Sequence, residues 1–183
     1  MQIEIIKKEI KGIIEIKNYK FKDHRGTFLN LLKKDSSVFK SIWGEREIQQ
    51  INISNTKNTG TVRGMHFQSE PYTEAKLITC IKGRIWDVAV DLRKDSSTFS
   101  KWCFVELSSK INNSIFIPEG FAHGFQSLEP ESELIYIHSQ KWVKDYDNGV
   151  NYRDKTLKIN WPMPPKHLSE KDLNLPFLDN YDF

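Results

Sequence analysis

The chain has 183 residues, enough for one domain with a buried core, and we expect a single domain over residues 1–183. Its 27 Lys and Arg against 24 Asp and Glu give a formal charge of +3 that is spread along the chain, which does not favour nucleic acid as a partner. No apolar run approaches the ~18 residues of a membrane span, and the N-terminus alternates charged and apolar residues, so we expect a cytoplasmic protein with no membrane partner.

Short apolar runs separated by turn signals predict a mostly β fold, a double-sheet sandwich or barrel with a few short helices. In the first third of the chain we expect strands at residues 3–6, 13–16, 27–32 and 49–54, with a turn at residues 21–26. A short helix is predicted from Asp35 to Trp43 after an Asp or Ser cap. The polar residues 55–60 then form a loop.

Residues 62–68 carry an unusual density of chemistry. Arg63, Gly64 and His66 place a permanent cation, a permissive backbone position and a titratable imidazole within four positions. The stretch alone fits equally a strand end with one solvated arginine and one hydrogen-bonded histidine. Its meaning therefore depends on the partners that the rest of the chain supplies.

The runs at residues 76–81 and 84–92 are joined by Lys82 and Gly83, which predicts a tight hairpin with a positive φ at the glycine. In that register, Lys76 and Asp87 project from the same inner face as diagonal neighbours. The pair is either a buried ion pair or an ammonium oriented toward a developing negative charge. Cys80 in this hairpin, and Cys103 in the next strand, suit buried reduced thiols.

Strands are expected at residues 102–107 and 114–117, followed by a tight loop at residues 118–125 that contains His123. We predict that residues 125–128 pair with residues 133–138 as a second hairpin. Tyr136 and His123 then share one face, although a shift of one residue would turn Tyr136 outward.

These residues favour a proton-transfer site over a metal site. Metal-binding cupins carry a His-x-His pair and a carboxylate, and later a histidine after Pro-x-Gly. The second part fits Pro118, Gly120 and His123, but Gln68 stands where the second histidine would be needed. We therefore expect no metal, and we do not favour nucleophilic catalysis because neither cysteine has an electropositive, exposed setting.

Several motifs together resemble the dTDP-4-dehydrorhamnose 3,5-epimerase family, from about Phe21 to Asp172. They are RGMHFQ at 63–68, AKL at 75–77, WDVAVDLRK at 86–94, STF at 97–99, IPEGFAHGF at 117–125 and WP at 161–162. The resemblance implies a jelly-roll cupin that needs no metal or redox cofactor. It also implies a homodimer with strands shared between subunits and a nucleotide-diphosphate 4-keto-6-deoxy sugar as substrate.

Site roles follow from the same resemblance. His66 matches the base, Asp172 the residue that orients it, Lys76 the cation facing the enolate oxygen, and Tyr136 the acid. His123 and Asp87 would line the sugar pocket and fix Lys76. Further substrate contacts are implied for Arg25 and Arg63, which match the diphosphate-binding arginines, and for Gln50 and Asn52.

Two departures concern the nucleotide. Asn30, close to Phe28 in the nucleotide region, stands where the family commonly has Glu, and Trp142 stands where a base-stacking Tyr is common, with Phe21 as the other candidate for stacking. Thymidine remains the first choice, while GDP-linked or CDP-linked sugars, including heptoses, stay open. A C3-only epimerase, a non-catalytic sugar-binding cupin and a metal cupin oxygenase also stay open as functions.

Overall fold

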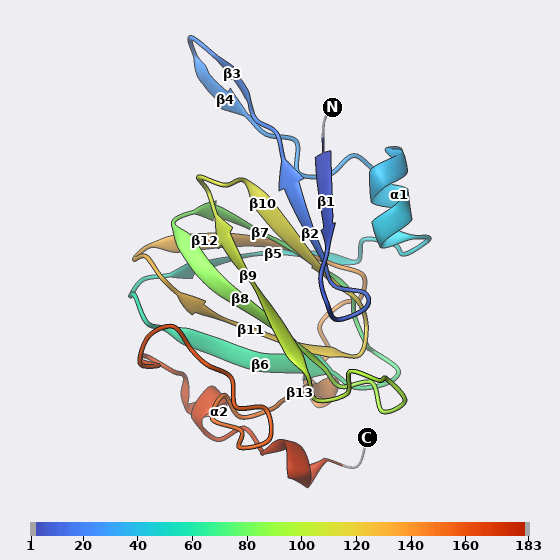
Figure 1. The fold of residues 1–183 in the computed structure, drawn as a ribbon, viewed down its shortest axis with the longest axis vertical. Coiled ribbons are helices and arrows are strands. Elements are labelled where there is room, and N and C mark those ends of the chain that lie inside the picture. The colour runs from blue at the N-terminus through green and yellow to red at the C-terminus, as the bar shows by residue number, and fades with distance from the viewer. Residues whose placement is uncertain (1–2, 182–183) are drawn as a thin grey trace.

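The computed structural model describes residues 3–181 and contains two facing antiparallel sheets with a hairpin that projects from them (Figure 1). The predicted mostly β, double-sheet class is confirmed. The six-stranded sheet has the order β1 (Ile3–Lys7), β2 (Ile14–Asn18), β10 (Asn113–Ile117), β7 (Lys76–Lys82), β12 (Ser132–His138), β5 (Gln50–Thr56). The five-stranded sheet has the order β13 (Asp147–Gly149), β6 (Val62–Gln68), β11 (Phe121–Ser127), β8 (Arg84–Asp91), β9 (Trp102–Ser108).

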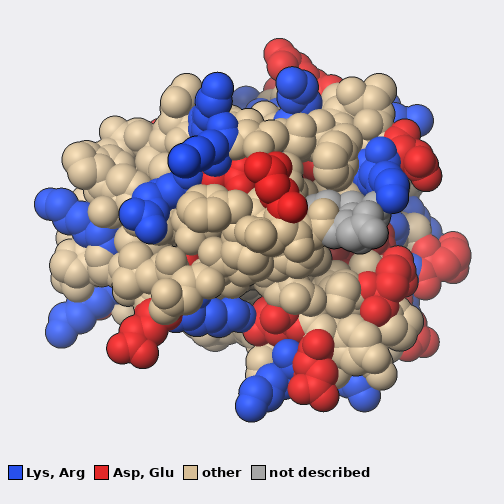
Figure 2. Space-filling model, turned by 90° about the horizontal axis from the view of Figure 1, so that it is seen from below, with Lys and Arg blue, Asp and Glu red and all other residues tan. Residues whose placement is uncertain are grey.

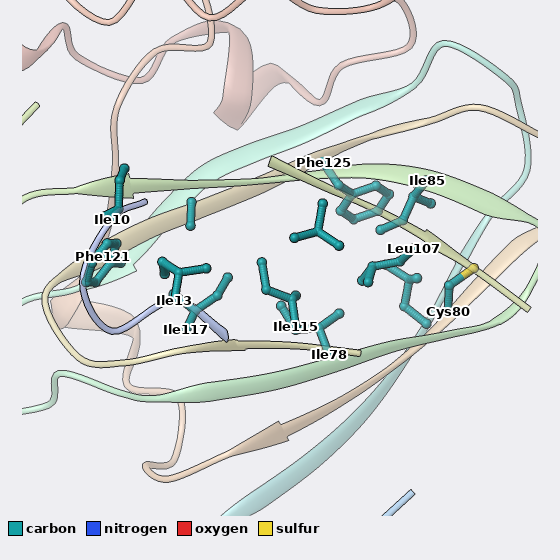
Figure 3. Close-up of a cluster of buried hydrophobic side chains, with 13 residues drawn as sticks. Ile10, Ile13, Ile78, Cys80, Ile85, Leu107, Ile115, Ile117, Phe121 and Phe125 are labelled. Atoms are coloured by element: carbon teal, nitrogen blue, oxygen red, sulfur yellow. The ribbon is translucent and has the colours of Figure 1, made fainter. Parts of the chain in front are cut away.

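The main core lies between the two sheets, and Figure 3 shows its side chains filling this space. Ile78 and Ile115 come from the six-stranded sheet, and Ile85, Leu107 and Phe125 come from the five-stranded sheet. Each is almost fully buried, which stabilises the fold by about 1.5–3 kcal/mol per side chain relative to exposure. Because successive side chains of a strand point to opposite faces of its sheet, the outer face of each sheet does not contribute to this core.

The hairpin predicted across Lys82 and Gly83 is wrong. β7 pairs with β10 and β12, whereas β8 pairs with β9 and β11, so the two strands belong to different sheets. Gly83 has φ +74°, and a Cβ there would lie 2.5 Å from the Ser132 hydroxyl oxygen, so the glycine is required by a corner between sheets. A glycine with positive φ fits a hairpin turn within one sheet and a corner between two sheets equally well, so the sequence does not distinguish the two.

The second predicted hairpin is also wrong, for a related reason. The residues expected to form a loop include most of β11, a central strand that pairs with β6 and β8, while β12 pairs with β5 and β7. A Cβ at Gly64 would lie 2.5 Å from the Cα of Gly124. These glycines therefore allow β6 and β11 to approach closely, and they do not mark a loop.

The predicted helix is confirmed as α1 (Ser37–Trp43). The Ser36 hydroxyl accepts a hydrogen bond from the Phe39 backbone N–H at 3.1 Å, and the helix ends at Gly44 with φ +65°. A second short helix, α2 (Glu170–Leu173), was not predicted, and 3₁₀ turns lie at Lys144–Tyr146 and Leu178–Asn180.

The strand expected at residues 27–32 is much shorter in the structure. β3 (Phe21–Asp23) and β4 (Gly26–Phe28) form a separate two-stranded hairpin, seen at the upper left of Figure 1. Every residue of both strands is exposed. Since two strands alone are marginally stable in water, this hairpin is a candidate for contact with another surface.

Basic and acidic side chains are interspersed on the face shown in Figure 2. Among residues 3–181, no helix has the length and apolar character needed to cross a membrane.

Candidate active site

Half of the site residues expected from the sequence line one pocket of about 550 Å³, a size within the usual range for small-molecule sites. Three more, Asp87, Asp172 and Gln50, are hydrogen-bonded to residues that line it. β5, β7 and β12 approach it from one sheet, and β6 and β11 from the other. Its lining combines polar, aromatic and aliphatic side chains: Ile51, Asn52, Ile53, Ser54, Arg63, His66, Glu74, Lys76, His123, Phe125, Tyr136, His138, Trp142, Asp147 and Lys171.

His66 is held by a carboxylate that is distant in the sequence. Its Nε2 lies 2.6 Å from Oδ1 of Asp172, which is 3% exposed, and the other Asp172 oxygen accepts the Gly64 backbone N–H at 3.4 Å. Burial opposes ionisation of Asp172, but these bonds outweigh it and lower the pKa of its carboxyl group. The α2 cap at Ser169 positions Asp172 by accepting its backbone N–H. The site therefore contains an imidazole oriented by an ionised carboxylate.

A second imidazole and carboxylate lie deeper between the sheets. His123 Nε2 lies 2.8 Å from Oδ2 of Asp87, and both side chains are buried. Burial lowers the pKa of His123 and raises the pKa of Asp87, each opposed by the partner's charge. β6 and β11 place His123 directly opposite His66. Of this pair of histidines, His66 is half-exposed at the pocket wall and His123 is buried beneath it.

Lys76 does not have the carboxylate partner that the sequence suggested. Its ammonium lies 3.0 Å from Oε1 of Glu74, and Asp87 instead bonds His123. Lys76 and Asp87 belong to opposite sheets. The charges of His123 and Lys76 both favour the ionised form of Asp87 and so limit the rise in its pKa. Sequence reasoning missed Glu74. The available signal was its position two residues before Lys76, which gives both side chains the same direction in an extended chain.

Tyr136 stands between the two buried histidines. Its ring is 6.0 Å from that of His123 in an edge arrangement and 5.9 Å from that of His138 in a stacked arrangement. Burial, followed by the nearby Asp87 charge, raises the pKa of the Tyr136 hydroxyl. The hydroxyl is therefore protonated at neutral pH. Although the expected pairing was wrong, His123 and Tyr136 do come together.

The mouth of the pocket carries the other substrate contacts expected from the sequence. Gln50, Asn52 and Trp142 lie together there through hydrogen bonds, and Arg63 lines the same pocket while donating to the Asn55 carbonyl at 3.0 Å. At the rim, the Lys171 ammonium lies 2.6 Å from the Asp147 carboxylate.

Four predicted nucleotide contacts lie elsewhere in the chain. Phe21, Arg25 and Phe28 belong to the projecting hairpin, where Arg25 pairs with Asp23 at 2.7 Å and keeps 79% of its side chain exposed. Asn30 lines a different groove, beside α1. Within one chain, these residues are not brought to the pocket.

The Gln68 side chain forms hydrogen bonds with backbone groups. Its amide donates to the carbonyls of Tyr72 and Lys141 and accepts the Val143 N–H at 2.7 Å, so it fixes the loop after β12. The described part of the chain has no group of three His, Cys, Asp or Glu side chains that could hold a metal ion. Cys80 and Cys103 are free thiols whose pKa values burial raises to about 11.

Comparison with known proteins identifies the family. The family model for dTDP-4-dehydrorhamnose 3,5-epimerase matches residues 7–180. The dTDP-4-dehydrorhamnose 3,5-epimerase of Shigella flexneri is 39% identical over 173 residues, covering 94% of this chain and 94% of that protein. The enzyme of the same name from Sinorhizobium fredii is 38% identical over 169 residues, covering 89% and 83%.

Two solved structures are informative. The dTDP-6-deoxy-D-glucose-3,5-epimerase of Legionella pneumophila, in complex with dTDP-4-keto-L-rhamnose, superimposes with a TM-score of 0.93 at 31% identity, covering 99% of this chain and 95% of that one. A 3'-monoepimerase of Streptomyces bikiniensis, in complex with dTDP-quinovose, gives a TM-score of 0.85 at 29% identity, covering 93% and 86%.

Proposed function

The chain belongs to the dTDP-4-dehydrorhamnose 3,5-epimerase family, and we propose that it inverts C3 and C5 of a dTDP-linked 4-keto-6-deoxy sugar by proton transfer. The observation that carries this proposal is the His66–Asp172 pair in the same pocket as the protonated Tyr136 hydroxyl. A base and an acid that approach a carbon from opposite sides are what inversion requires.

In the proposed reaction, His66 removes the proton from the carbon next to the C4 ketone. Its Nε2 is engaged by Asp172, so Nδ1 is the ring atom left to accept this proton. The ionised Asp172 then stabilises the imidazolium that forms. The electron pair of the broken C–H bond moves onto the C4 oxygen, where the Lys76 ammonium stabilises the enolate.

The return proton comes from Tyr136. Its raised pKa keeps the hydroxyl protonated until the enolate carbon accepts the proton from the opposite face and the C4 ketone re-forms. The same steps invert the second carbon after His66 has released its proton to solvent and the Tyr136 oxygen has regained one. His123 lines the pocket, and Asp87 lies behind it and bonds its Nε2. In this proposal neither transfers a proton, because their bond at 2.8 Å and their burial favour a fixed pair.

We also propose a homodimer in which the β3–β4 hairpin of one subunit reaches the pocket of its partner. Phe21 and Phe28 are 54% and 65% exposed on this hairpin, and Ile51 and Ile53 are 61% and 70% exposed on the edge strand β5 beside the pocket. Arg25 would then join Arg63 at the diphosphate. The dTDP-sugar bound to the Legionella relative supports thymidine as the nucleoside.

The reaction is placed in the cytoplasm in this proposal, because Cys80 and Cys103 are unpaired thiols, as is usual in reducing compartments. Its product would supply sugar for cell-surface polysaccharide.

Proton exchange tests the proposed reaction directly. The protein is incubated in D2O with dTDP-4-keto-6-deoxyglucose, and deuterium is located in the sugar by NMR; we expect label at both C3 and C5. Tight binding without exchange would instead indicate a sugar-binding protein. A parallel panel of GDP-linked and CDP-linked 4-keto sugars tests the nucleotide.

A C3-only epimerase is the second candidate, since the Streptomyces relative is a 3'-monoepimerase. Label at C3 alone would establish it and exclude inversion at C5.

A further inference from the structure

One polar network in the pocket has no part in the proton transfers described above. It runs from the Trp142 backbone N–H to Gln50 Oε1 at 2.9 Å, then from Gln50 Nε2 to Asn52 Oδ1 at 3.1 Å. Asn52 Nδ2 lies 3.2 Å from His138 Nε2, and His138 Nδ1 lies 2.7 Å from Glu74 Oε2. The other oxygen of Glu74 meets Lys76.

The direction of the hydrogen bonds in this network is fixed at its first link. A backbone N–H can only donate, so Gln50 must present its oxygen to Trp142 and its amide nitrogen to Asn52. Asn52 in turn presents its amide nitrogen to His138, whose Nε2 must accept. His138 is therefore neutral and carries its hydrogen on Nδ1, which donates to Glu74. All links agree on one tautomer.

The far end of the network is a buried ion pair. The side chains of Glu74 and Lys76 are each 9% exposed, and that of His138 is 10% exposed. Burial favours the neutral form of Glu74, but the charge of Lys76 and the hydrogen bond from His138 outweigh it and lower the pKa of this carboxyl group. Glu74 is therefore ionised and is the carboxylate in contact with the Lys76 ammonium.

A contact of this kind gives Lys76 a fixed direction. The lysine side chain is flexible and its ammonium has three donors, so one bond to a held carboxylate limits where the other two point. Glu74 can hold Lys76 only if Glu74 itself is held, and the described donor to its second oxygen is His138. Without His138, the carboxylate would be free to turn and would attract Lys76 more strongly.

We propose that Glu74 and His138 are positioning residues that hold the Lys76 ammonium at the ketone oxygen, linked through Asn52 and Gln50 to the mouth of the pocket at Trp142. This proposal rests on the epimerase reaction proposed above. Correct placement is worth a large factor, since displacement by about 1 Å can reduce turnover ~100-fold.

Substitutions of Glu74 and His138 test the contacts of this network one at a time. Glu74→Gln removes the charge at constant size. His138→Asn keeps an amide nitrogen where Nδ1 stands, whereas His138→Gln places the amide nearer to the position of Nε2. We expect Glu74→Gln and His138→Gln to lower kcat at least ~10-fold with KM changed less than ~3-fold, and His138→Asn to stay within ~3-fold of wild type.

Glu15→Gln is the control, because Glu15 is also a buried glutamate paired with a lysine and hydrogen-bonded to a second side chain, and it lies outside the pocket. We expect it to leave kcat unchanged. Equal kcat in wild type and Glu74→Gln would overturn the proposal, as would equal losses in His138→Asn and His138→Gln.

A measurement without turnover distinguishes this proposal from the proposed reaction. In ¹⁵N NMR of the histidine rings, His138 should show a protonated Nδ1 and an unprotonated Nε2 in wild type, and Glu74→Gln should perturb that pattern. The opposite tautomer would refute the network even in an active enzyme. A wild-type protein with the expected tautomer but no exchange on any 4-keto sugar would refute the reaction and, with it, the role of Lys76.

Discussion

Three carboxylates divide the work of the pocket by the groups that they contact. Asp172 bonds the half-exposed His66, Asp87 bonds the buried His123, and Glu74 bonds both Lys76 and His138. In the reaction proposed above, the first pairing leaves a ring nitrogen free to accept a proton, the second holds its imidazole in a fixed pair, and the third directs a cation. Residues of the same chemical type thus take different roles because their neighbours differ.

Substitution of the base and the acid should separate proton removal from inversion. We expect His66→Ala and Tyr136→Phe each to lower turnover at least ~100-fold, the low end for loss of acid-base catalysis. In D2O, however, Tyr136→Phe should still exchange substrate protons through His66, while His66→Ala should not. Turnover and deuterium content are measured on the same samples by NMR. Full activity of Tyr136→Phe would contradict its assignment as the acid.

Single residues were predictable to different degrees. His66 and Lys76 stand out in the sequence, but 106 positions separate His66 from Asp172, and their contact requires the C-terminal segment to fold back beside β6. Family resemblance suggested that pairing, which spacing alone could not. The sequence pattern offers Asp87 as the partner of Lys76, but only through a hairpin that does not form, and Glu74 takes its place.

At the scale of elements, strand positions were more predictable than strand pairing. Alternating apolar runs located β7, β8 and β12 to within a few residues, because burial of one face leaves a local signal. Which sheet each strand joins depends on contacts distant in the sequence, and two short connections were misread as hairpin turns. The site residues nevertheless met, since facing sheets direct their inner side chains into one space.

The turn after β8 supplies a test of pH dependence. The Asp91 carboxylate, fully buried, accepts hydrogen bonds from Arg93, Ser96 and Thr98. Burial opposes its charge, but these donors lower its pKa from 3.8 to about 2. A depressed carboxyl pKa contributes stability above the unfolded pKa, and that contribution is lost as pH falls toward the folded pKa.

Asp91→Asn should therefore lower the free energy of unfolding by about 2 kcal/mol at pH 7, and the deficit should shrink below about pH 4. Urea unfolding at several pH values measures this difference. Asp95→Asn, an exposed position in the same turn, is the matched control and should change stability by less than about 0.5 kcal/mol. A deficit that stays constant down to pH 3 would show that the charge of Asp91 is not responsible.

At the scale of the whole molecule, one chain does not bring together all the residues that our proposal assigns to the substrate. The pocket holds those assigned to the sugar and one arginine, while Arg25 and two exposed phenylalanines lie on a hairpin that projects away from the sheets (Figure 1). A symmetric dimer would unite the two sets twice, because the same exchange occurs in both directions.

Mixed dimers can decide whether the hairpin serves the partner's pocket. His66→Ala disables the pocket and Arg25→Ala disables the hairpin, so each variant alone should be nearly inactive. In a mixed dimer with exchanged hairpins, one site combines both defects and the other combines a wild-type pocket with a wild-type hairpin. Random reassociation of equal amounts makes about half of the dimers mixed, so activity should recover to about a quarter of the wild-type value. Hairpins that serve their own pocket would leave every site defective, and mixing would then restore nothing.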